Sequence, residues 1–253
     1  MHRPAAGPAV IPLDDATSVL VLTGAGVSAE SGIPTFRSAG GLWESHPVEQ
    51  VASPQGFARD PALVWRFYSE RRRHARSCAP NSGHQALRDL ETRLGDRFLL
   101  ATQNVDDLHL RAGSTRVVEL HGNLFQTRCS RCGLPPFREE REHLGPELPL
   151  CPACAEAGRR QLLRPNIVWF GEMLEPAHLE RIDHFMRTAR RLVFVAAGTS
   201  GAVWPAAGLV NVARDLGAST WLVNAEPADN TASFDHFVEG PSGTVLPVLL
   251  GSA

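Results

Sequence analysis

Four cysteines lie in two Cys-x-x-Cys pairs, a spacing typical of a metal site. Cys129 and Cys132 form the first pair, and Cys151 and Cys154 form the second after eighteen intervening residues. Four thiolates at this spacing suit tetrahedral zinc, and because no coordination position stays open, we expect one structural zinc ion. Disulfide bonds are the less favoured alternative, since the N-terminal residues do not resemble a secretion signal. Cys78 lies outside both pairs and is expected to be a small buried residue.

A glycine-rich loop follows the first apolar segment. Val19 to Leu22 are consecutive apolar residues, as in a strand buried on both faces. Gly24, Gly26 and Ala29 then match the loose form of the dinucleotide fingerprint, in which glycines let backbone approach a phosphate, although a tight bend alone would also explain them. The acidic strand end that a dehydrogenase places about twenty residues later is absent. We therefore expect a ligand that is not held as in an ordinary dehydrogenase.

Polar or glycine residues follow each segment that we expect to be a strand. The expected strands are 19–22, 98–101, 117–120, 192–197 and 221–223. After the first come the glycines, and after the others come Thr102 to Asp107, His121 to Asn123, Gly198 to Ser200, and Asn224 to Glu226. Since ligands bind beyond the carboxyl ends of the strands in an open α/β sheet, these segments should converge on one crevice.

Helical patterns separate several of these strands. Asp60 and Pro61 suit the start of a helix that runs to about Arg76, and Ser82 with Gln85 suits a capping box for a second helix. Further helices are expected near 178–190 and 206–216. The alternation predicts an α/β fold: a Rossmann-like doubly wound parallel sheet with an inserted small zinc-binding module and a helical/loop module. We expect residues 1–36, 79–126 and 159–253 in the Rossmann-like domain, 37–78 in the helical/loop part of a small domain, and 127–158 in the zinc-binding module.

Composition narrows the function classes. The chain has 253 residues and a formal net charge of −2, which favours neither nucleic acid nor an acidic membrane as partner. Around the cysteines, Arg128 and Arg131 are balanced by glutamates, so we expect no direct nucleic-acid binding. No apolar run reaches membrane-spanning length and no targeting segment is evident, so we expect a cytoplasmic protein with no membrane partner. All 25 basic residues are arginine, which excludes a catalytic lysine.

Several motifs, taken in order, resemble one protein family. They are Gly24-Ala25-Gly26-Val27-Ser28, Pro34-Thr35-Phe36-Arg37, Thr102-Gln103-Asn104-Val105-Asp106, His121-Gly122, the two cysteine pairs, Arg164-Pro165, Val168-Trp169-Phe170-Gly171-Glu172, Gly198-Thr199-Ser200, and Asn224 with Glu226. Together they resemble the sirtuins, which are NAD-dependent protein-lysine deacylases. The resemblance covers nearly the whole chain and implies cleavage of acyl-lysine with release of nicotinamide and O-acyl-ADP-ribose.

The resemblance also implies roles for the residues at the strand ends. The implied NAD-binding residues are Gly24, Ala25, Gly26, Ser28, Glu30, Phe36, Arg37, Gln103, Asn104, Asp106, Gly198, Thr199, Ser200, Asn224, Glu226 and Ser242. Of these, Gln103, Asn104 and Asp106 would hold nicotinamide, because amide and carboxylate side chains suit its neutral amide. His121 would be the catalytic general base, which suits a group that titrates near neutrality. Taken singly, a buried histidine and a helix cap are the simpler explanations for His121 and Asp106.

A finer resemblance concerns the acyl group. Tyr68 and Arg71 resemble the Tyr-x-x-Arg signature of class III sirtuins, which remove succinyl, malonyl and glutaryl groups, and a spacing of three puts both on one helix face. Arg71 would bind the distal acyl carboxylate, Tyr68 would donate a hydrogen bond, and Ala52 would leave room for the longer chain. The implied substrate-binding residues are Ala52, Tyr68, Arg71, Val168, Trp169, Phe170, Gly171, Glu172 and Trp204. Residues 168–172 would pair with the backbone of an acyl-lysine protein or peptide as an added strand.

Two departures and three alternatives remain open. Trp204 stands where class III members often have tyrosine beside the substrate tunnel, and Ala225 replaces a more usual threonine or similar residue. The first departure bears on the width of the tunnel and so on the preferred acyl group. The alternatives are a broad-range deacetylase, a protein ADP-ribosyltransferase, and a non-catalytic NAD or ADP-ribose sensor. A sensor would not need a base at His121. We expect the protein to act as a monomer.

Overall fold

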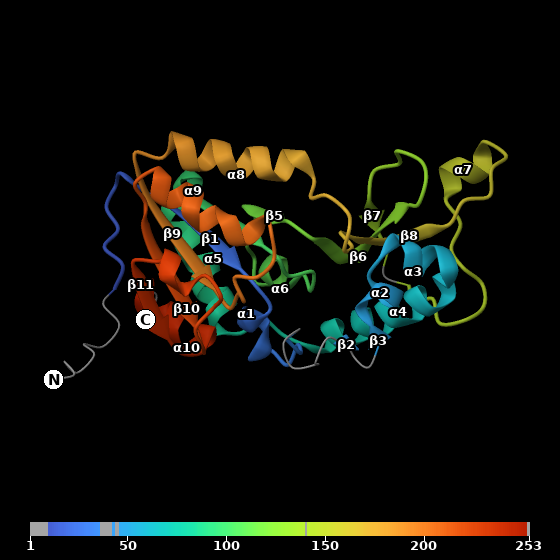
Figure 1. The fold of residues 1–253 in the computed structure, drawn as a ribbon, viewed down its shortest axis with the longest axis horizontal. Coiled ribbons are helices and arrows are strands. Elements are labelled where there is room, and N and C mark those ends of the chain that lie inside the picture. The colour runs from blue at the N-terminus through green and yellow to red at the C-terminus, as the bar shows by residue number, and fades with distance from the viewer. Residues whose placement is uncertain (1–9, 36–41, 44–45, 140, 252–253) are drawn as a thin grey trace.

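A larger lobe built around a six-stranded sheet and a smaller lobe of helices and short strands make up the chain (Figure 1). The structure is a computed structural model that describes residues 10–35, 42–43, 46–139 and 141–251. Phe36 and Arg37, which the sirtuin resemblance assigns to NAD binding, lie outside the described residues.

The large sheet is parallel throughout. Its strands are β1 (Thr17–Thr23), β4 (Phe98–Thr102), β5 (Val117–Glu119), β9 (Arg191–Ala197), β10 (Ser219–Asn224) and β11 (His236–Glu239). Their order across the sheet is β11-β10-β9-β1-β4-β5, with Leu20 paired to Leu99 on one side and to Phe194 on the other. The order reverses direction between β1 and β9, as in the Rossmann arrangement, and the carboxyl ends of these two strands mark the ligand crevice of such sheets. The predicted fold class is confirmed.

Helices cover both faces of this sheet. One face packs against α5 (Ser82–Leu94) and α10 (Ser242–Leu249), and the other against α8 (Pro176–Thr188) and α9 (Leu209–Asp215) (Figure 1). Successive residues of β1 alternate between the two layers: Val19 and Val21 face the first pair of helices, and Leu20 and Leu22 face the second. This double burial explains why β1 is apolar at consecutive positions.

The small lobe has its own antiparallel sheet and its own core. The sheet has the order β7-β6-β8, from β6 (Gly122–Cys129), β7 (Phe137–Arg138) and β8 (Leu163–Ile167). Around it lie α2 (Val48–Val51), α3 (Pro54–Arg59), α4 (Pro61–Ser77) and α7 (Pro152–Glu156), with a short hairpin of β2 (Leu42–Trp43) and β3 (His46–Pro47). Its sheet extends beyond the segment 127–158 expected to form the zinc module: β6 begins before residue 127, β7 lies inside the segment, and β8 follows it. The expected division into domains stays a prediction.

Three details differ from the expectations. The N-cap of α5 is Asn81, whose side chain accepts from the Gly83 and His84 N–H groups, and not Ser82, whose hydroxyl instead donates to the Gly243 carbonyl at 2.6 Å. The helix expected near 206–216 is divided into a 3₁₀ turn, η3 (Ala206–Gly208), and α9. The edge strand β11 was not predicted, because it is short and mostly exposed.

No helix in the described ranges has the length and apolar character needed to cross a bilayer.

Candidate functional site

Two glycine loops meet where the strand order reverses. The loop after β1 leads into the short helix α1 (Gly26–Ala29), and the Gly26 N–H donates to the Gly198 carbonyl after β9 at 2.8 Å. A Cβ on Gly26 would lie 2.7 Å from the Gly198 Cα, and one on Gly198, whose φ is +62°, would lie 2.2 Å from the Val27 nitrogen. Backbone contact between the two loops therefore requires glycine at both positions. The sequence had indicated only approach to a phosphate or a tight bend.

A buried polar cluster lies beside these loops. The Ser28 hydroxyl on α1 donates to Asp106 Oδ2 at 2.7 Å and accepts from Asn104 Nδ2 at 3.1 Å. Asp106 Oδ1 accepts from the Leu108 N–H at 3.0 Å, although the N-cap of the short helix α6 (Leu108–Arg111) is the next residue, Asp107. Burial raises the pKa of Asp106, and the hydrogen bonds from Leu108 and Ser28 oppose the rise. The cluster joins the ends of β1 and β4.

Further bonds tie β9 and β10 to the same crevice. Gln103 Nε2 donates to Thr199 Oγ1 at 3.0 Å, and Asn224 Nδ2 donates to the Thr199 carbonyl at 2.7 Å. Polar residues after four strands therefore lie in one connected set, which confirms the predicted convergence. The NAD-binding roles of Gly24, Ala25, Gly26, Ser28, Gln103, Asn104, Asp106, Gly198, Thr199, Ser200 and Asn224 stay predictions.

Three other expected NAD residues lie in different surroundings. Glu30 Oε2 accepts from the Gly243 N–H at 2.6 Å, so Glu30 ties the end of α1 to the start of α10. Ser242, the first residue of α10, is buried, whereas Glu226 is exposed beyond β10. Their proposed contacts with NAD are not tested by these positions.

His121 follows β5 at the point where the chain passes to the small lobe. Its Nδ1 lies 3.0 Å from the Gln103 carbonyl oxygen. Because a carbonyl oxygen can only accept, Nδ1 carries the hydrogen and Nε2 is the unprotonated nitrogen of the neutral ring. Burial lowers the pKa of His121, and the bond to Gln103 partly opposes this. The ring is therefore held as a neutral base at ordinary pH.

Tyr68 and Arg71 lie on α4 within the core of the small lobe. Both side chains are buried, and Tyr68 accepts a hydrogen bond from Trp169 Nε1 at 2.9 Å. Burial raises the pKa of Tyr68 far above its usual value, although the positive charge of Arg71 opposes the rise, so the hydroxyl stays protonated. Ala52, at the end of α2, is also buried, and its carbonyl accepts from the Phe170 N–H at 3.0 Å. Ala52, Tyr68 and Trp169, far apart in sequence, thus pack in one buried cluster of the small lobe.

Most backbone N–H groups of the segment 168–172 already donate hydrogen bonds within the protein. The N–H groups of Val168, Trp169, Phe170 and Glu172 donate to the His121 carbonyl, the Glu172 carboxylate, the Ala52 carbonyl and the Trp169 carbonyl, respectively. A substrate strand added here would have to rely mainly on carbonyl oxygens, and this role stays a prediction. The Trp169 side chain is buried, whereas Phe170 is exposed. Gly171 has a φ of +87°, a conformation that suits glycine at this turn.

Trp204 lies in the loop before η3 and is 71% exposed. Its ring covers Gly208, where a Cβ would come within 2.5 Å of the indole. The indole is thus fixed against η3 on one face and open to solvent on the other. The substrate-binding role of Trp204 stays a prediction.

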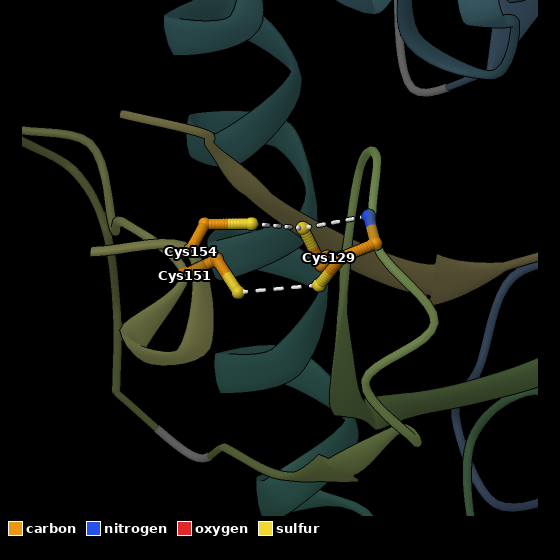
Figure 2. Close-up of side chains that lie close together, drawn as sticks. Cys129, Cys151 and Cys154 are labelled. Carbon is orange, nitrogen blue, oxygen red and sulfur yellow. Dashed lines mark hydrogen bonds between the residues drawn. The ribbon is translucent and has the colours of Figure 1, made fainter. Parts of the chain in front are cut away.

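The four cysteines of the two pairs gather in the small lobe. Their sulfur atoms lie within 4.8 Å of one another, with 3.9 Å between Cys129 and Cys154 and 3.6 Å between Cys132 and Cys151. Figure 2 shows Cys129, Cys151 and Cys154 turned toward one another. Zinc–sulfur bonds of about 2.3 Å in a tetrahedron place the sulfurs roughly 3.8 Å apart, so the set fits a zinc ion with four thiolate ligands.

Arg164 was noted in the sequence only as part of the Arg164-Pro165 motif, without a role of its own. The guanidinium of Arg164, on β8, lies 3.4 Å from the centre of the Trp169 ring and binds Glu172 with two hydrogen bonds of 2.6 and 2.9 Å. The sequence offers no signal for a buried arginine of this kind, because its partners are aromatic and acidic residues whose proximity depends on the turn after β8.

Comparison with known proteins places these features in one family. Residues 24–205 match the model of the Sir2 family. A protein of Pasteurella multocida named NAD-dependent protein deacylase is 47% identical over 90% of this chain and 94% of its own. A crystal structure of a Sir2 homologue with NAD superposes with a TM-score of 0.82 and 43% identity over 92% of this chain and 88% of that chain. A Sir2 structure with a p53 peptide and NAD gives a TM-score of 0.77 and 30% identity over 93% of this chain and 92% of that one.

Proposed function

Since this chain belongs to the Sir2 family and is an NAD-dependent protein deacylase, we propose that it acts chiefly on lysines that carry acidic acyl groups, namely succinyl, malonyl or glutaryl. Deacetylation is the weaker activity. The observation that carries this proposal is the burial of Tyr68 and Arg71 on one face of α4, beside Ala52.

A buried guanidinium favours an acidic acyl group for a physical reason. Its charge is costly to desolvate unless an anion or strong acceptors approach it, and a distal carboxylate offers both charge and two oxygen atoms. An acetyl group ends in a methyl and offers neither. Tyr68, kept protonated by burial, adds one donor to the same carboxylate.

The remaining residues fit the steps that the chain itself must perform. Bound NAD supplies the ribose that receives the acyl group and nicotinamide as the leaving group. Asn104 and Asp106 would orient the nicotinamide amide, and the Ser28 hydroxyl holds their side chains in place. His121 would accept a proton from a ribose hydroxyl at Nε2, because Nδ1 is fixed by the Gln103 carbonyl. The four cysteines fit a structural zinc and lie outside this group of residues.

Matched succinyl-lysine and acetyl-lysine peptides test the acyl preference. We expect the wild-type protein to have the higher kcat/KM with succinyl-lysine, and the double variant Tyr68→Phe, Arg71→Met to lose about 100-fold with that peptide while retaining deacetylation, because charge-assisted hydrogen bonds are lost. Equal losses with both peptides, or a wild-type preference for acetyl-lysine, would contradict the proposal.

His121→Ala distinguishes deacylation from mere binding of NAD. This variant should bind NAD and release almost no deacylated peptide. Unchanged peptide deacylation would remove His121 from the mechanism. We also propose that the protein is a cytoplasmic monomer. Its small net charge supports the further proposal that it makes no direct nucleic-acid contacts.

A further inference from the structure

We propose that Arg164, held by Glu172, is a positioning residue for acyl recognition: it fixes the Trp169 indole, which in turn orients the Tyr68 hydroxyl toward the acyl carboxylate. This inference rests on the proposed acidic-acyl preference and extends it to a residue outside the Tyr-x-x-Arg pair.

The first step is the bond between Trp169 and Tyr68. An indole N–H can only donate, so the Tyr68 oxygen is the acceptor in this 2.9 Å bond. The hydrogen of the Tyr68 hydroxyl must then be directed away from the indole. Because a carboxylate only accepts, a phenol hydroxyl can bind it only by donating this hydrogen.

The second step is what fixes the indole. The Arg164 guanidinium lies 3.4 Å from the centre of the Trp169 ring, a contact that a planar cation makes well. The Trp169 backbone N–H donates to Glu172 Oε2 at 2.9 Å. The indole is therefore held by its face and by its own backbone, and both contacts belong to one ion pair.

The third step is what fixes Arg164. Its two terminal nitrogens donate to the two Glu172 oxygens at 2.6 and 2.9 Å, and Nη2 also donates to the Ile167 carbonyl at 2.8 Å. The residue is only 6% exposed. Burial lowers the pKa of Arg164, while the bonds to Glu172 raise it and so favour the charged form. Lysine could keep the charge here, but not the fork of two bonds or the flat contact with the indole.

A double-mutant cycle with the holoprotein tests this role. The measured quantity is the ratio of kcat/KM for succinyl-lysine to that for acetyl-lysine in peptides of one sequence. We expect Tyr68→Phe to lower the ratio about tenfold and Arg164→Lys to lower it about fivefold, mainly through the KM of the succinyl peptide. Because both act through one hydroxyl, adding Arg164→Lys to Tyr68→Phe should lower the ratio no further.

Arg128→Lys is the matched control. Arg128 also contacts the Glu172 carboxylate, at 3.3 Å, but its side chain is 36% exposed, and the guanidinium over the indole belongs to Arg164. The control should keep the ratio within twofold of wild type. If Arg164→Lys does not fold, Glu172→Gln releases the same guanidinium and should give the same loss and the same lack of additivity with Tyr68→Phe.

The outcomes separate this inference from the function on which it rests. If Tyr68→Phe lowers the ratio and Arg164→Lys leaves it within twofold, or if the two losses multiply, the positioning role is wrong and the acyl preference stands. If the wild-type protein shows no succinyl preference and Tyr68→Phe changes nothing, both proposals fail.

Discussion

At the scale of single residues, one hydrogen bond decides what the candidate base can do. The Gln103 carbonyl oxygen accepts a hydrogen bond from His121 Nδ1–H, which leaves Nε2 to accept a proton. Burial lowers the pKa of His121, so the neutral, reactive form persists to lower pH than in an exposed histidine. Nearby, burial raises the pKa of Glu119 to about 7, and the bond from Asn123 opposes the rise.

The pH profile of deacylation should show the His121 shift. Activity requires the neutral ring, so it should be complete above the His121 pKa and fall as pH falls through that pKa. Because the pKa is lowered, we expect the midpoint of the acid limb of kcat/KM below about 6.5, the usual histidine value. The measurement is kcat/KM for the preferred peptide from about pH 5 to about pH 9, which covers both sides of the usual histidine pKa.

Glu119→Gln is the control for this profile. If His121 sets the acid limb, the limb keeps its position in the variant. A limb centred near 7 in the wild-type protein that disappears in Glu119→Gln would assign the titration to Glu119 and contradict the prediction.

At the scale of elements, the loops after β1 and β9 pack backbone against backbone. Their glycines leave no room for a methyl group, and this contact holds the two loops against each other beyond the paired ends of β1 and β9. The small lobe depends on a different element, the four-cysteine cluster, which joins the turn after β6 to the start of α7.

Gly198→Ala should destabilise the fold by about 3 kcal/mol or more, because the new Cβ would meet the Val27 nitrogen and the φ of +62° is unfavourable for alanine. Gly217→Ala is the matched control, since Gly217 has a φ of +79° with nothing within 4 Å of the added Cβ. It should cost only about 1 kcal/mol. Denaturant unfolding of both variants measures the difference. Equal losses would mean that the loop contact is not tight.

Metal analysis should find one zinc per chain, and Cys132→Ser should reduce it well below one and lower the thermal unfolding midpoint, because three thiolates bind zinc more weakly than four. Cys78→Ser, outside the cluster, should keep its zinc. Wild-type protein purified without chelators that contains no zinc would contradict the assignment.

At the scale of the whole molecule, a protein that belongs to a family of lysine deacylases contains no lysine of its own. All 25 basic residues are arginine, so the chain contains no ε-amine that an acyl donor could modify. A deacylase that carried reactive lysines near its site would itself be subject to the modification that it removes.

Treatment with an amine-directed acetylating ester should therefore leave deacylation unchanged. Intact mass after hydroxylamine treatment should show at most one amide adduct, on the terminal amine. Arg187→Lys, at a side chain that is 60% exposed, should add one adduct and serve as the control for the reagent. Several stable adducts on the wild-type chain, or loss of activity, would contradict this expectation.

Patterns within the sequence were enough to predict the class of fold, the family and a four-cysteine cluster that fits zinc. These depend on local patterns: consecutive apolar residues in strands, helical spacing, glycine after a strand, and two cysteine pairs. Predictions from local patterns were wrong or missing where contacts distant in sequence decided the structure. Ser82 resembled a helix cap, but its hydroxyl bonds Gly243 across the fold, and β11 had too few buried residues to show a strand pattern.

Which side chains contact one another became clear from the folded chain. The Gly26 contact with Gly198, the Trp169 bond to Tyr68 and the Arg164 contact with Trp169 depend on backbone turns and lobe packing that residue types do not encode locally. The physical reason is that a hydrogen bond or ring contact is sensitive to fractions of an ångström, whereas a sequence pattern specifies only which face of an element is buried. The sequence therefore predicted the pair Tyr68 and Arg71, and the fold added the Trp169 bond to Tyr68 and the Arg164 contact with Trp169.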